Sequence, residues 1–106
     1  MVKKTRTIYI DIDGTICTNP EEVSTEYDYA KSSPIKENIE KANKLYNEGH
    51  KIVYWTARGS LSGIDWTDLT TKQLKKWGVK HHELRLDKPF FDIFIDDKNI
   101  NAKDWK

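Results

Sequence analysis

Short apolar runs along the chain predict four β-strands. "TIYIDI" (residues 7–12) and "KIVYWT" (residues 51–56) are rich in β-branched and aromatic residues and are bounded by polar residues or glycine, as buried strands are. "ELRL" (residues 83–86) predicts a third strand and "FDIFI" (residues 91–95) a fourth.

Two stretches between these runs repeat their apolar residues at helical spacing and predict amphipathic helices. The first begins with Ser33 as a candidate N-cap and Pro34 at the first helical position, and Gly49 ends it. Its apolar positions are Ile35, Ile39, Ala42, Leu45 and Tyr46. The second extends over residues 65–77, and Gly78 ends it. Its apolar positions are Trp66, Leu69, Leu74 and Trp77.

The order strand, helix, strand, helix, strand, strand predicts an α/β fold. We expect a three-layer, Rossmann-like arrangement with a mostly parallel sheet and right-handed crossovers. The chain has no repeat and no linker, so residues 1–106 are expected to form a single domain. Residues 18–33 are acidic and show no clear period, which predicts a loop or flap. In such sheets, ligands bind beyond the carboxyl ends of the strands.

Composition narrows the class of protein. Lysine and arginine number 18 against 17 for aspartate and glutamate, so there is no basic excess of the kind that binds nucleic acid or a membrane surface. No apolar run approaches the roughly 20 residues that a bilayer span needs. The basic start lacks the apolar stretch of a signal peptide, and Cys17 is the single cysteine. We therefore expect a cytoplasmic protein without a disulfide.

Polar side chains follow three of the predicted strands. Asp11 and Asp13 end the first strand, Thr56 ends the second, and Asp96 and Asp97 follow the fourth. A lysine, Lys88, precedes the fourth strand. Because the carboxyl ends of parallel strands meet at one edge of a sheet, we expect these side chains to converge on one site.

The residue types at this edge suit phosphoryl transfer. Asp11 and Asp13 are two positions apart, so on an extended chain they point the same way. The next residue, Gly14, allows a sharp turn whose amide N–H groups suit phosphate oxygens. Several carboxylates in one place repel one another unless a cation such as Mg²⁺ offsets their charge. Thr56 offers a hydroxyl and Lys88 a positive charge to a phosphoryl group.

Three segments together resemble the signature motifs of the haloacid dehalogenase superfamily of phosphohydrolases. They are "DIDGT", "VYWTARG" and "KPFFDIFIDD", and they occur in the order of the superfamily's motifs between residues 7 and 97. The resemblance implies that Asp11 is the nucleophile that forms an aspartyl-phosphate. It implies that Asp13 protonates the leaving oxygen and later activates water.

The same resemblance assigns the other residues. Thr56 would hold the phosphoryl group with the adjacent Ala57, and Lys88 would contact both phosphate and nucleophile. Mg²⁺ would be bound by the Asp11 carboxylate, the Asp13 carbonyl, and Asp96 with Asp97 nearby. The expected reaction is therefore hydrolysis of a phosphate monoester.

One departure from the superfamily concerns its cap domain. Most relatives carry a cap inserted between motifs, whereas the segments here are shorter than the roughly 40 residues that fold alone. The chain therefore resembles a capless member. Its site would accept a large substrate, or a second copy in a homo-oligomer would supply the lid. The short form is similar to phosphatases of capsule or surface-polysaccharide biosynthesis, which implies a small phosphoester such as a sugar phosphate.

Simpler interpretations apply to single residues. An Asp-Gly pair is most often a turn, and an arginine such as Arg58 is as often a surface residue as a phosphate contact. Cys17 lacks the downstream arginine of cysteine phosphatases and is expected to pack in the core. Trp66 lies near the predicted mouth of the site and is a candidate substrate contact.

Two alternative functions remain open on the sequence. A receiver-type signalling module also combines aspartates, threonine, lysine and Mg²⁺, but residues 51–56 offer no phosphoacceptor aspartate. A nucleic-acid end phosphatase would suit an open site. The acidic residues of the flap, which are Glu21, Glu22, Glu26 and Asp28, would repel a nucleic-acid backbone.

Overall fold

The sheet consists of three parallel strands. The computed structural model describes residues 4–20, 22–23 and 26–106. Strand β4 (Lys51–Trp55) lies in the middle, with β1 (Thr7–Ile10) on one side and β5 (Glu83–Arg85) on the other. Ile8 pairs with Ile52 in the first pair of strands, and Tyr54 with Leu84 in the second. The three predicted strands through residue 86 are therefore present and parallel, each slightly shorter than expected.

Two helices connect these strands. Helix α1 (Lys36–Asn47) lies between β1 and β4, and α2 (Thr67–Lys76) lies between β4 and β5. Both predicted helices are present. No helix among the residues described is long and apolar enough to cross a membrane.

The predicted N-cap of α1 is wrong. Ile35 occupies that position, and no side chain there accepts a hydrogen bond. The residues before the helix are extended instead. Pro34 forms an isolated antiparallel β-bridge with Cys17, and the Ile35 amide donates to the Ile16 carbonyl at 2.8 Å. Pairing with the segment after β1 therefore takes precedence over an earlier start of the helix.

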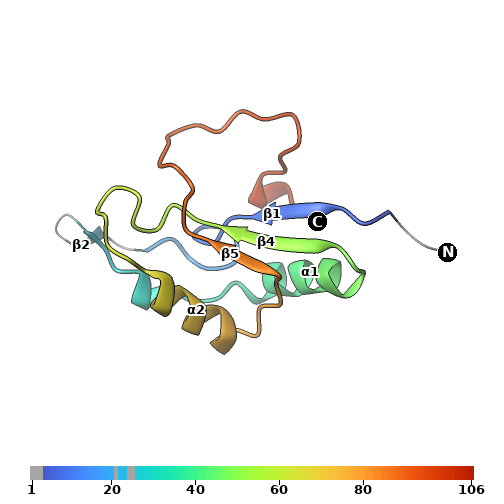
Figure 1. Ribbon diagram of the computed structural model, residues 1–106, viewed down its shortest axis with the longest axis horizontal. Helices are drawn as coiled ribbons and strands as arrows, with labels where there is room; N and C mark the ends of the chain where they lie inside the picture. Colours follow the sequence, from blue (N-terminus) through green and yellow to red (C-terminus); the bar gives the residue numbers. More distant parts are fainter. Residues whose placement is uncertain (1–3, 21, 24–25) are drawn as a thin grey trace.

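Alternate residues of the strands face the core. Ile8, Ile10, Ile52 and Tyr54 pack in one cluster that also contains Ile39 and Ala42 of α1 and Leu74 of α2. Both helices therefore cover the same face of the sheet, as Figure 1 shows. Tyr9 and Trp55 point to the other face, where their rings meet edge to face at 5.6 Å. The described residues thus form a mixed α/β fold around a small open sheet.

The segment between β1 and α1 contains more structure than the predicted loop. Strands β2 (Glu22–Val23) and β3 (Glu26–Tyr27) form a two-residue antiparallel pair, and the 3₁₀ helix η1 (Tyr29–Lys31) follows them. The Thr18 amide donates to the Ser33 carbonyl at 2.9 Å and closes the segment at its base. Of the acidic flap residues, Glu21 lies outside the described residues.

The fourth predicted strand is not formed. Residues 91–95 are irregular and follow a long loop away from the sheet (Figure 1), before the 3₁₀ helix η2 (Ala102–Asp104) near the C-terminus. Ile93 is 78% exposed and Ile95 93% exposed. A strand requires a neighbouring edge as well as suitable residues. Within the described residues β1 pairs with β4 alone, so this segment has not taken the outer edge of β1.

Candidate active site

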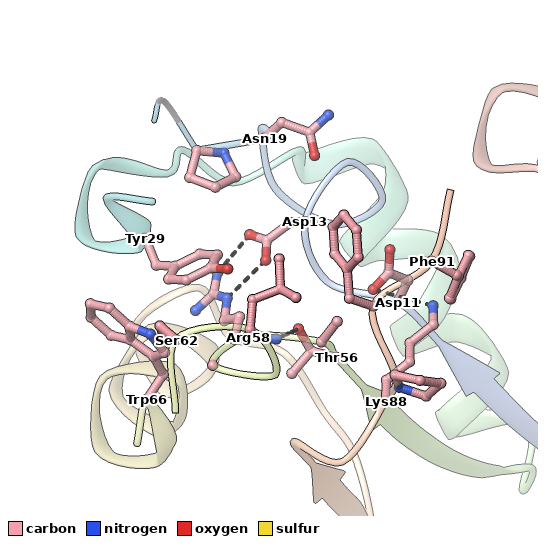
Figure 2. Close-up of a pocket in the computed structure, with 16 residues that line it drawn as sticks. Asp11, Asp13, Asn19, Tyr29, Thr56, Arg58, Ser62, Trp66, Lys88 and Phe91 are labelled. Atoms are coloured by element: carbon pink, nitrogen blue, oxygen red, sulfur yellow. Dashed lines mark hydrogen bonds and ion pairs between the residues drawn. The ribbon is translucent and has the colours of Figure 1, made fainter. Parts of the chain in front are cut away.

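A cavity of about 510 Å³ lies where the carboxyl ends of β1 and β4 meet. Its lining includes six residues that the sequence assigned to the site, which are Asp11, Asp13, Thr56, Ala57, Arg58 and Lys88. Trp66 also lines it. Figure 2 shows Asp11 and Lys88 at one end, Tyr29 and Trp66 at the other, and Asp13 between them.

Asp11 lies beside a lysine. The Lys88 ammonium nitrogen is 3.7 Å from the Asp11 carboxylate, and the Asp11 side chain is 38% exposed. Burial raises the pKa of Asp11, and the positive charge of Lys88 opposes that rise. The carboxylate is thus partly desolvated yet accessible from the cavity, as a nucleophile must be.

Aromatic rings surround the charged end of Lys88. Its ammonium group lies 5.2 Å from the ring centre of Phe91, 5.6 Å from that of Trp55 and 6.0 Å from that of Phe94. Such contacts with the faces of rings attract a cation. The Lys88 amide also donates to the Thr56 carbonyl at 3.2 Å. The lysine is therefore held in place from both its backbone and its side chain.

Asp13 is held by an arginine instead of a lysine. Arg58 donates from Nε to one Asp13 oxygen at 3.0 Å and from a terminal nitrogen to the other at 2.9 Å. The Arg58 side chain is completely buried, and that of Asp13 is 16% exposed. Such a two-pronged pair fixes the plane of the carboxylate.

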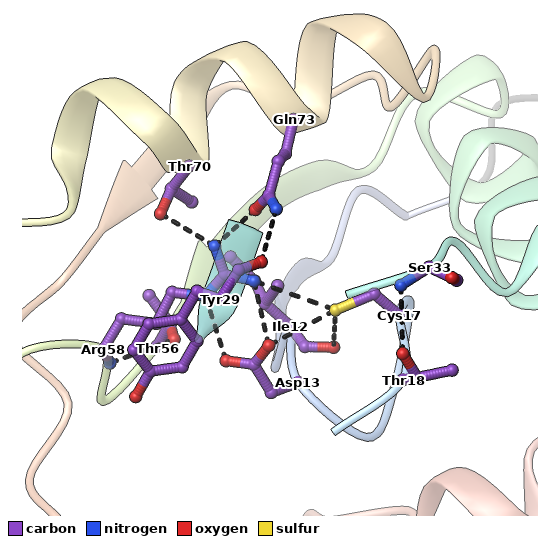
Figure 3. Close-up of polar contacts among 10 residues, drawn as sticks. All are labelled: Ile12, Asp13, Cys17, Thr18, Tyr29, Ser33, Thr56, Arg58, Thr70 and Gln73. Carbon is purple, nitrogen blue, oxygen red and sulfur yellow. Dashed lines mark hydrogen bonds and ion pairs between the residues drawn. The ribbon is translucent and has the colours of Figure 1, made fainter. Parts of the chain in front are cut away.

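The rest of the guanidinium is held by helix α2 and the flap (Figure 3). One terminal nitrogen donates to Thr70 at 3.0 Å and to Gln73 at 2.5 Å, and the other also reaches the Cys17 sulfur at 3.8 Å. The Tyr29 ring lies 4.7 Å from the guanidinium carbon. All five N–H donors of Arg58 thus have partners, and none is left for a phosphoryl group in this arrangement.

Sequence reasoning missed Thr70 and Gln73. Both are buried, and Gln73 additionally donates to the Tyr29 carbonyl at 2.7 Å. One signal was present: these polar residues lie on the predicted apolar face of the helix with Trp66 and Leu74, at positions 66, 70, 73 and 74. Nothing in the pattern indicated Tyr29, because the flap has no period.

Thr56 is buried and its hydroxyl oxygen accepts a hydrogen bond from the Arg58 amide at 3.3 Å. Its hydroxyl hydrogen remains able to donate into the cavity that Thr56 and Ala57 line. This is the arrangement in which the side chain could hold a phosphoryl oxygen.

The turn after β1 does not form the predicted phosphate cradle. Gly14 has a φ of +82°, as a sharp turn requires, but it does not line the large cavity. Its amide donates to the Cys17 carbonyl at 2.8 Å, and the amides of Thr15 and Ile16 donate to the Ile12 carbonyl. These N–H groups are therefore used within the turn.

Cys17 packs in the core, as the sequence predicted. It is fully buried, and its thiol donates to the Asp13 carboxylate at 3.3 Å. Burial, with a smaller effect of the nearby Asp13 charge, raises the pKa of Cys17 to about 12. The sulfur is thus a neutral thiol at physiological pH and does not act as a nucleophile.

The second acidic pair lies outside the cavity. Asp96 and Asp97 follow the exposed segment, and the Asp96 carboxylate accepts a hydrogen bond from the Lys98 amide at 3.2 Å, which lowers the pKa of Asp96. Across the part of the chain that the structure describes, no three acidic, histidine or cysteine side chains come close enough to hold a metal. The structure therefore brings together Asp11, Asp13, Thr56 and Lys88, but not Asp96 and Asp97.

Comparison with known proteins supports the fold and leaves the activity open. No protein-family model matches the sequence. No curated protein matches it significantly. Among solved structures, the chain is similar to an MCSG target from Vibrio cholerae, with a TM-score of 0.80 and 24% sequence identity. The similarity covers 93% of this chain and 85% of the Vibrio cholerae chain, so nearly the whole fold is shared.

Proposed function

We propose that this protein is a phosphomonoester hydrolase of the capless haloacid dehalogenase type, with Asp11 as its nucleophile and Mg²⁺ as its cofactor. A small phosphorylated metabolite is the proposed substrate. The choice of a sugar phosphate of surface-polysaccharide biosynthesis rests on the resemblance of the three sequence motifs. The proposal also includes a complete three-layer Rossmann-like core. The exposed apolar residues after β5 are of the type that would pack in such a core.

One observation carries the proposal. Two aspartates line a single cavity, and each is paired with a different cation: Asp11 with Lys88 at 3.7 Å and Asp13 with Arg58 at 2.9 Å. The proposed reaction needs one carboxylate as the nucleophile and another as the proton carrier. Different surroundings allow Asp11 and Asp13 to take these two roles.

The first half of the proposed reaction forms an aspartyl-phosphate. An Asp11 oxygen attacks phosphorus, and the bond between phosphorus and the alcohol oxygen breaks. The alcohol takes a proton from Asp13, which becomes a carboxylate. Arg58 stabilises that carboxylate through its two hydrogen bonds. Lys88 and Thr56 are placed to attract the phosphoryl oxygens, because both line the cavity beside Asp11.

The second half returns the enzyme to its starting state. Water attacks phosphorus while the Asp13 carboxylate takes its proton, and the bond to Asp11 breaks. Inorganic phosphate leaves, and Asp13 again carries the proton for the next cycle. The open side of Asp11 gives water access to this intermediate, since the side chain is 38% exposed.

The proposed magnesium site is incomplete as the side chains lie. Asp13 is committed to Arg58, and Asp96 and Asp97 do not line the cavity. Among the described lining residues, Asp11 is the carboxylate that is left for the ion. Mg²⁺ is included in the proposal because the aspartates of the motifs carry hard oxygen donors, which Mg²⁺ prefers.

Magnesium dependence is predicted separately. Protein treated with EDTA is expected to lose turnover of 4-nitrophenyl phosphate, and added Mg²⁺ to restore it. Asp96→Asn should raise the Mg²⁺ concentration needed for half-maximal turnover, whereas Asp92→Asn, a change at an exposed aspartate of the same segment, should not. Full turnover in EDTA would remove the cofactor from the proposal.

The test of the nucleophile uses the same assay. Asp11→Asn is expected to abolish turnover with Mg²⁺ present, because an amide cannot form the acyl phosphate. Asp13→Asn should slow it by a factor on the order of 10²–10⁴, the usual contribution of a proton carrier. Asp68→Asn on the exposed face of α2 is the matched control and should leave turnover unchanged. Normal activity of Asp11→Asn would refute the assignment.

A further inference from the structure

We propose that the end of the cavity away from Asp11 is a subsite for an uncharged ring in the alcohol part of the substrate. This inference deepens the proposed function and rests on it. The substrate class is a phosphomonoester whose leaving alcohol carries an uncharged ring. A hexose and an aryl alcohol share this chemistry, because both present a face of C–H or ring carbon to an aromatic side chain.

Asp11 and Lys88 lie apart from that end, and the Arg58 guanidinium behind the Tyr29 ring already donates its N–H groups to other side chains. Among the described lining residues, the charged side chains are Asp11, Asp13, Arg58 and Lys88. Arg58 is paired with Asp13 and Lys88 with Asp11, so the Asp11 and Lys88 end is left for the phosphoryl group. The remainder of the described lining is uncharged. A second phosphate or a carboxylate on the alcohol would be desolvated there without a partner, at a large cost in binding free energy.

Two aromatic rings form the wall at that end. Tyr29 of η1 and Trp66 before α2 meet edge to face, with ring centres 5.1 Å apart. Tyr29 is fixed from behind by the Arg58 guanidinium at 4.7 Å, and both rings are half-buried. Rings held by packing offer contact area at a small entropic cost, which suits them to bind another ring.

The loop after β4 is shaped around Trp66. Gly59 has a φ of +84°, and a Cβ atom there would lie 2.2 Å from the Ile64 carbonyl oxygen and 3.3 Å from the Trp66 ring. A side chain at this position would therefore displace the loop that positions the Trp66 ring. The position of Trp66 thus depends on a glycine placed for close approach.

The order of groups along the cavity matches the order of groups in such a substrate. Figure 2 shows Asp13 between the Asp11 end and the Tyr29–Trp66 end. A phosphoryl group beside Asp11 therefore places the ester oxygen near Asp13 and the alcohol toward the two rings. A volume of about 510 Å³ lies within the range of about 300–1,000 Å³ typical of small-molecule sites, so the cavity has room for the alcohol as well as the phosphoryl group.

The experiment compares esters that differ in the alcohol. The pair is benzyl phosphate and ethyl phosphate, both esters of primary alcohols, so the ring is the main difference. We expect kcat/KM to be on the order of tenfold higher for benzyl phosphate, mostly through a lower KM. A carboxylate on the ring, in 4-carboxybenzyl phosphate, should remove this advantage. Hexose 6-phosphate and glycerol 3-phosphate form the corresponding sugar pair and show which kind of ring is preferred.

The variants isolate the tryptophan. Trp66→Ala should reduce the benzyl-to-ethyl ratio of kcat/KM at least threefold, and Trp66→Phe should retain part of it. Trp77→Ala, a half-buried tryptophan outside the cavity lining, is the matched control and should leave the ratio unchanged. A ratio measured within one variant does not depend on how much of that variant is folded.

Failure of the subsite differs from failure of the proposed function. Equal kcat/KM for the benzyl and ethyl esters, or a ratio that Trp66→Ala leaves intact, would overturn the subsite while the phosphatase stands. If no ester is hydrolysed, the phosphatase proposal fails, and calorimetry with benzylphosphonate and ethylphosphonate decides the subsite. Tighter binding of the benzyl compound that Trp66→Ala removes supports it, and equal binding overturns it.

Discussion

Asp11 and Asp13 are two residues apart and have different surroundings. Asp11 continues the alternation of β1 toward the face that carries Trp55, where Lys88 lies over the ring of that tryptophan. Asp13 follows the buried Ile12 and meets the buried guanidinium of Arg58. The positive partner of each carboxylate thus comes from a different loop, and its effect can be tested separately.

Removal of Lys88 is predicted to move the acidic limb of the pH profile. Burial raises the pKa of Asp11, and the positive charge of Lys88 opposes that rise. Lys88→Met removes this charge and is therefore expected to raise the pKa of Asp11 further. A nucleophilic carboxylate must be ionised, so kcat/KM should begin to fall at a higher pH than in the parent protein. Measurements of kcat/KM against pH test this, with Lys72→Met as the control. A limb that stays in place or moves to lower pH would contradict the prediction.

Loss of Arg58 is predicted to cost stability. Arg58→Met leaves the largely buried Asp13 carboxylate without its partner, and we expect the free energy of unfolding to fall by about 3 kcal/mol. Asp13→Asn in the same chain should recover much of this loss, because it removes the stranded charge. Urea unfolding of the two single variants and the double variant measures the coupling. Additive effects would show that the ion pair contributes little.

Much of the candidate site was predictable at the level of residues. The types and order of Asp11, Asp13, Thr56 and Lys88 indicated phosphate chemistry, and the structure gathers these four around one cavity. The partner of Arg58 was not predictable. A sequence shows that an arginine follows a strand, but the direction of its side chain depends on Thr70 and Gln73, which lie on a helix formed later in the chain.

At the scale of elements, the strands and helices were predictable where apolar residues repeat. Errors occur where a local signal competes with pairing. Ser33 and Pro34 are residue types that favour a helix start. In the structure, however, Pro34 forms a β-bridge with Cys17, and the Ile35 amide donates to the Ile16 carbonyl. Hydrogen bonds to the segment after β1 satisfy these backbone groups before the helix begins. Propensity alone does not contain that information.

Strand β4 carries a polar atom whose removal is predicted to stabilise the protein. The Tyr54 hydroxyl is buried and has no hydrogen-bond partner among the residues that the structure describes, and burial raises the pKa of Tyr54. Tyr54→Phe removes the unpaired group and is expected to increase the free energy of unfolding by about 1 kcal/mol. Thermal or urea unfolding measures the change. Tyr9→Phe, at a half-exposed tyrosine of β1, should change it by less, and a loss of stability in Tyr54→Phe would indicate a partner for the hydroxyl.

At the scale of the whole molecule, the α/β class and the parallel order of three strands were predictable, and the position of residues 91–95 was not. Their aromatic and β-branched residues satisfy the propensity for a strand, but a strand also needs a partner edge. In the structure this segment lies away from β1, and with it lie Asp96 and Asp97. A local pattern therefore predicted an element whose existence depends on a contact between distant parts of the chain.

The exposure of this segment leads to a stability prediction. Ile93→Asp and Ile95→Asp replace residues that are 78% and 93% exposed, so each should change the free energy of unfolding by less than about 0.5 kcal/mol. Ile52→Asp, at a fully buried position of β4, should prevent folding. Circular dichroism and urea unfolding distinguish these outcomes. A large loss in Ile93→Asp would show that residues 91–95 are packed in solution, as the four-strand prediction requires.

The loop after β4 combines one position that cannot change with two that can. Gly59 has no room for a side chain, whereas Leu61 is 70% exposed and Ser62 is also exposed at the rim of the cavity. In the proposed phosphatase, selection for a new leaving group is therefore expected to act on positions 61 and 62 at little cost to folding. Among homologous chains, divergence of substrate preference would be concentrated at these two positions, while glycine persists two residues before them.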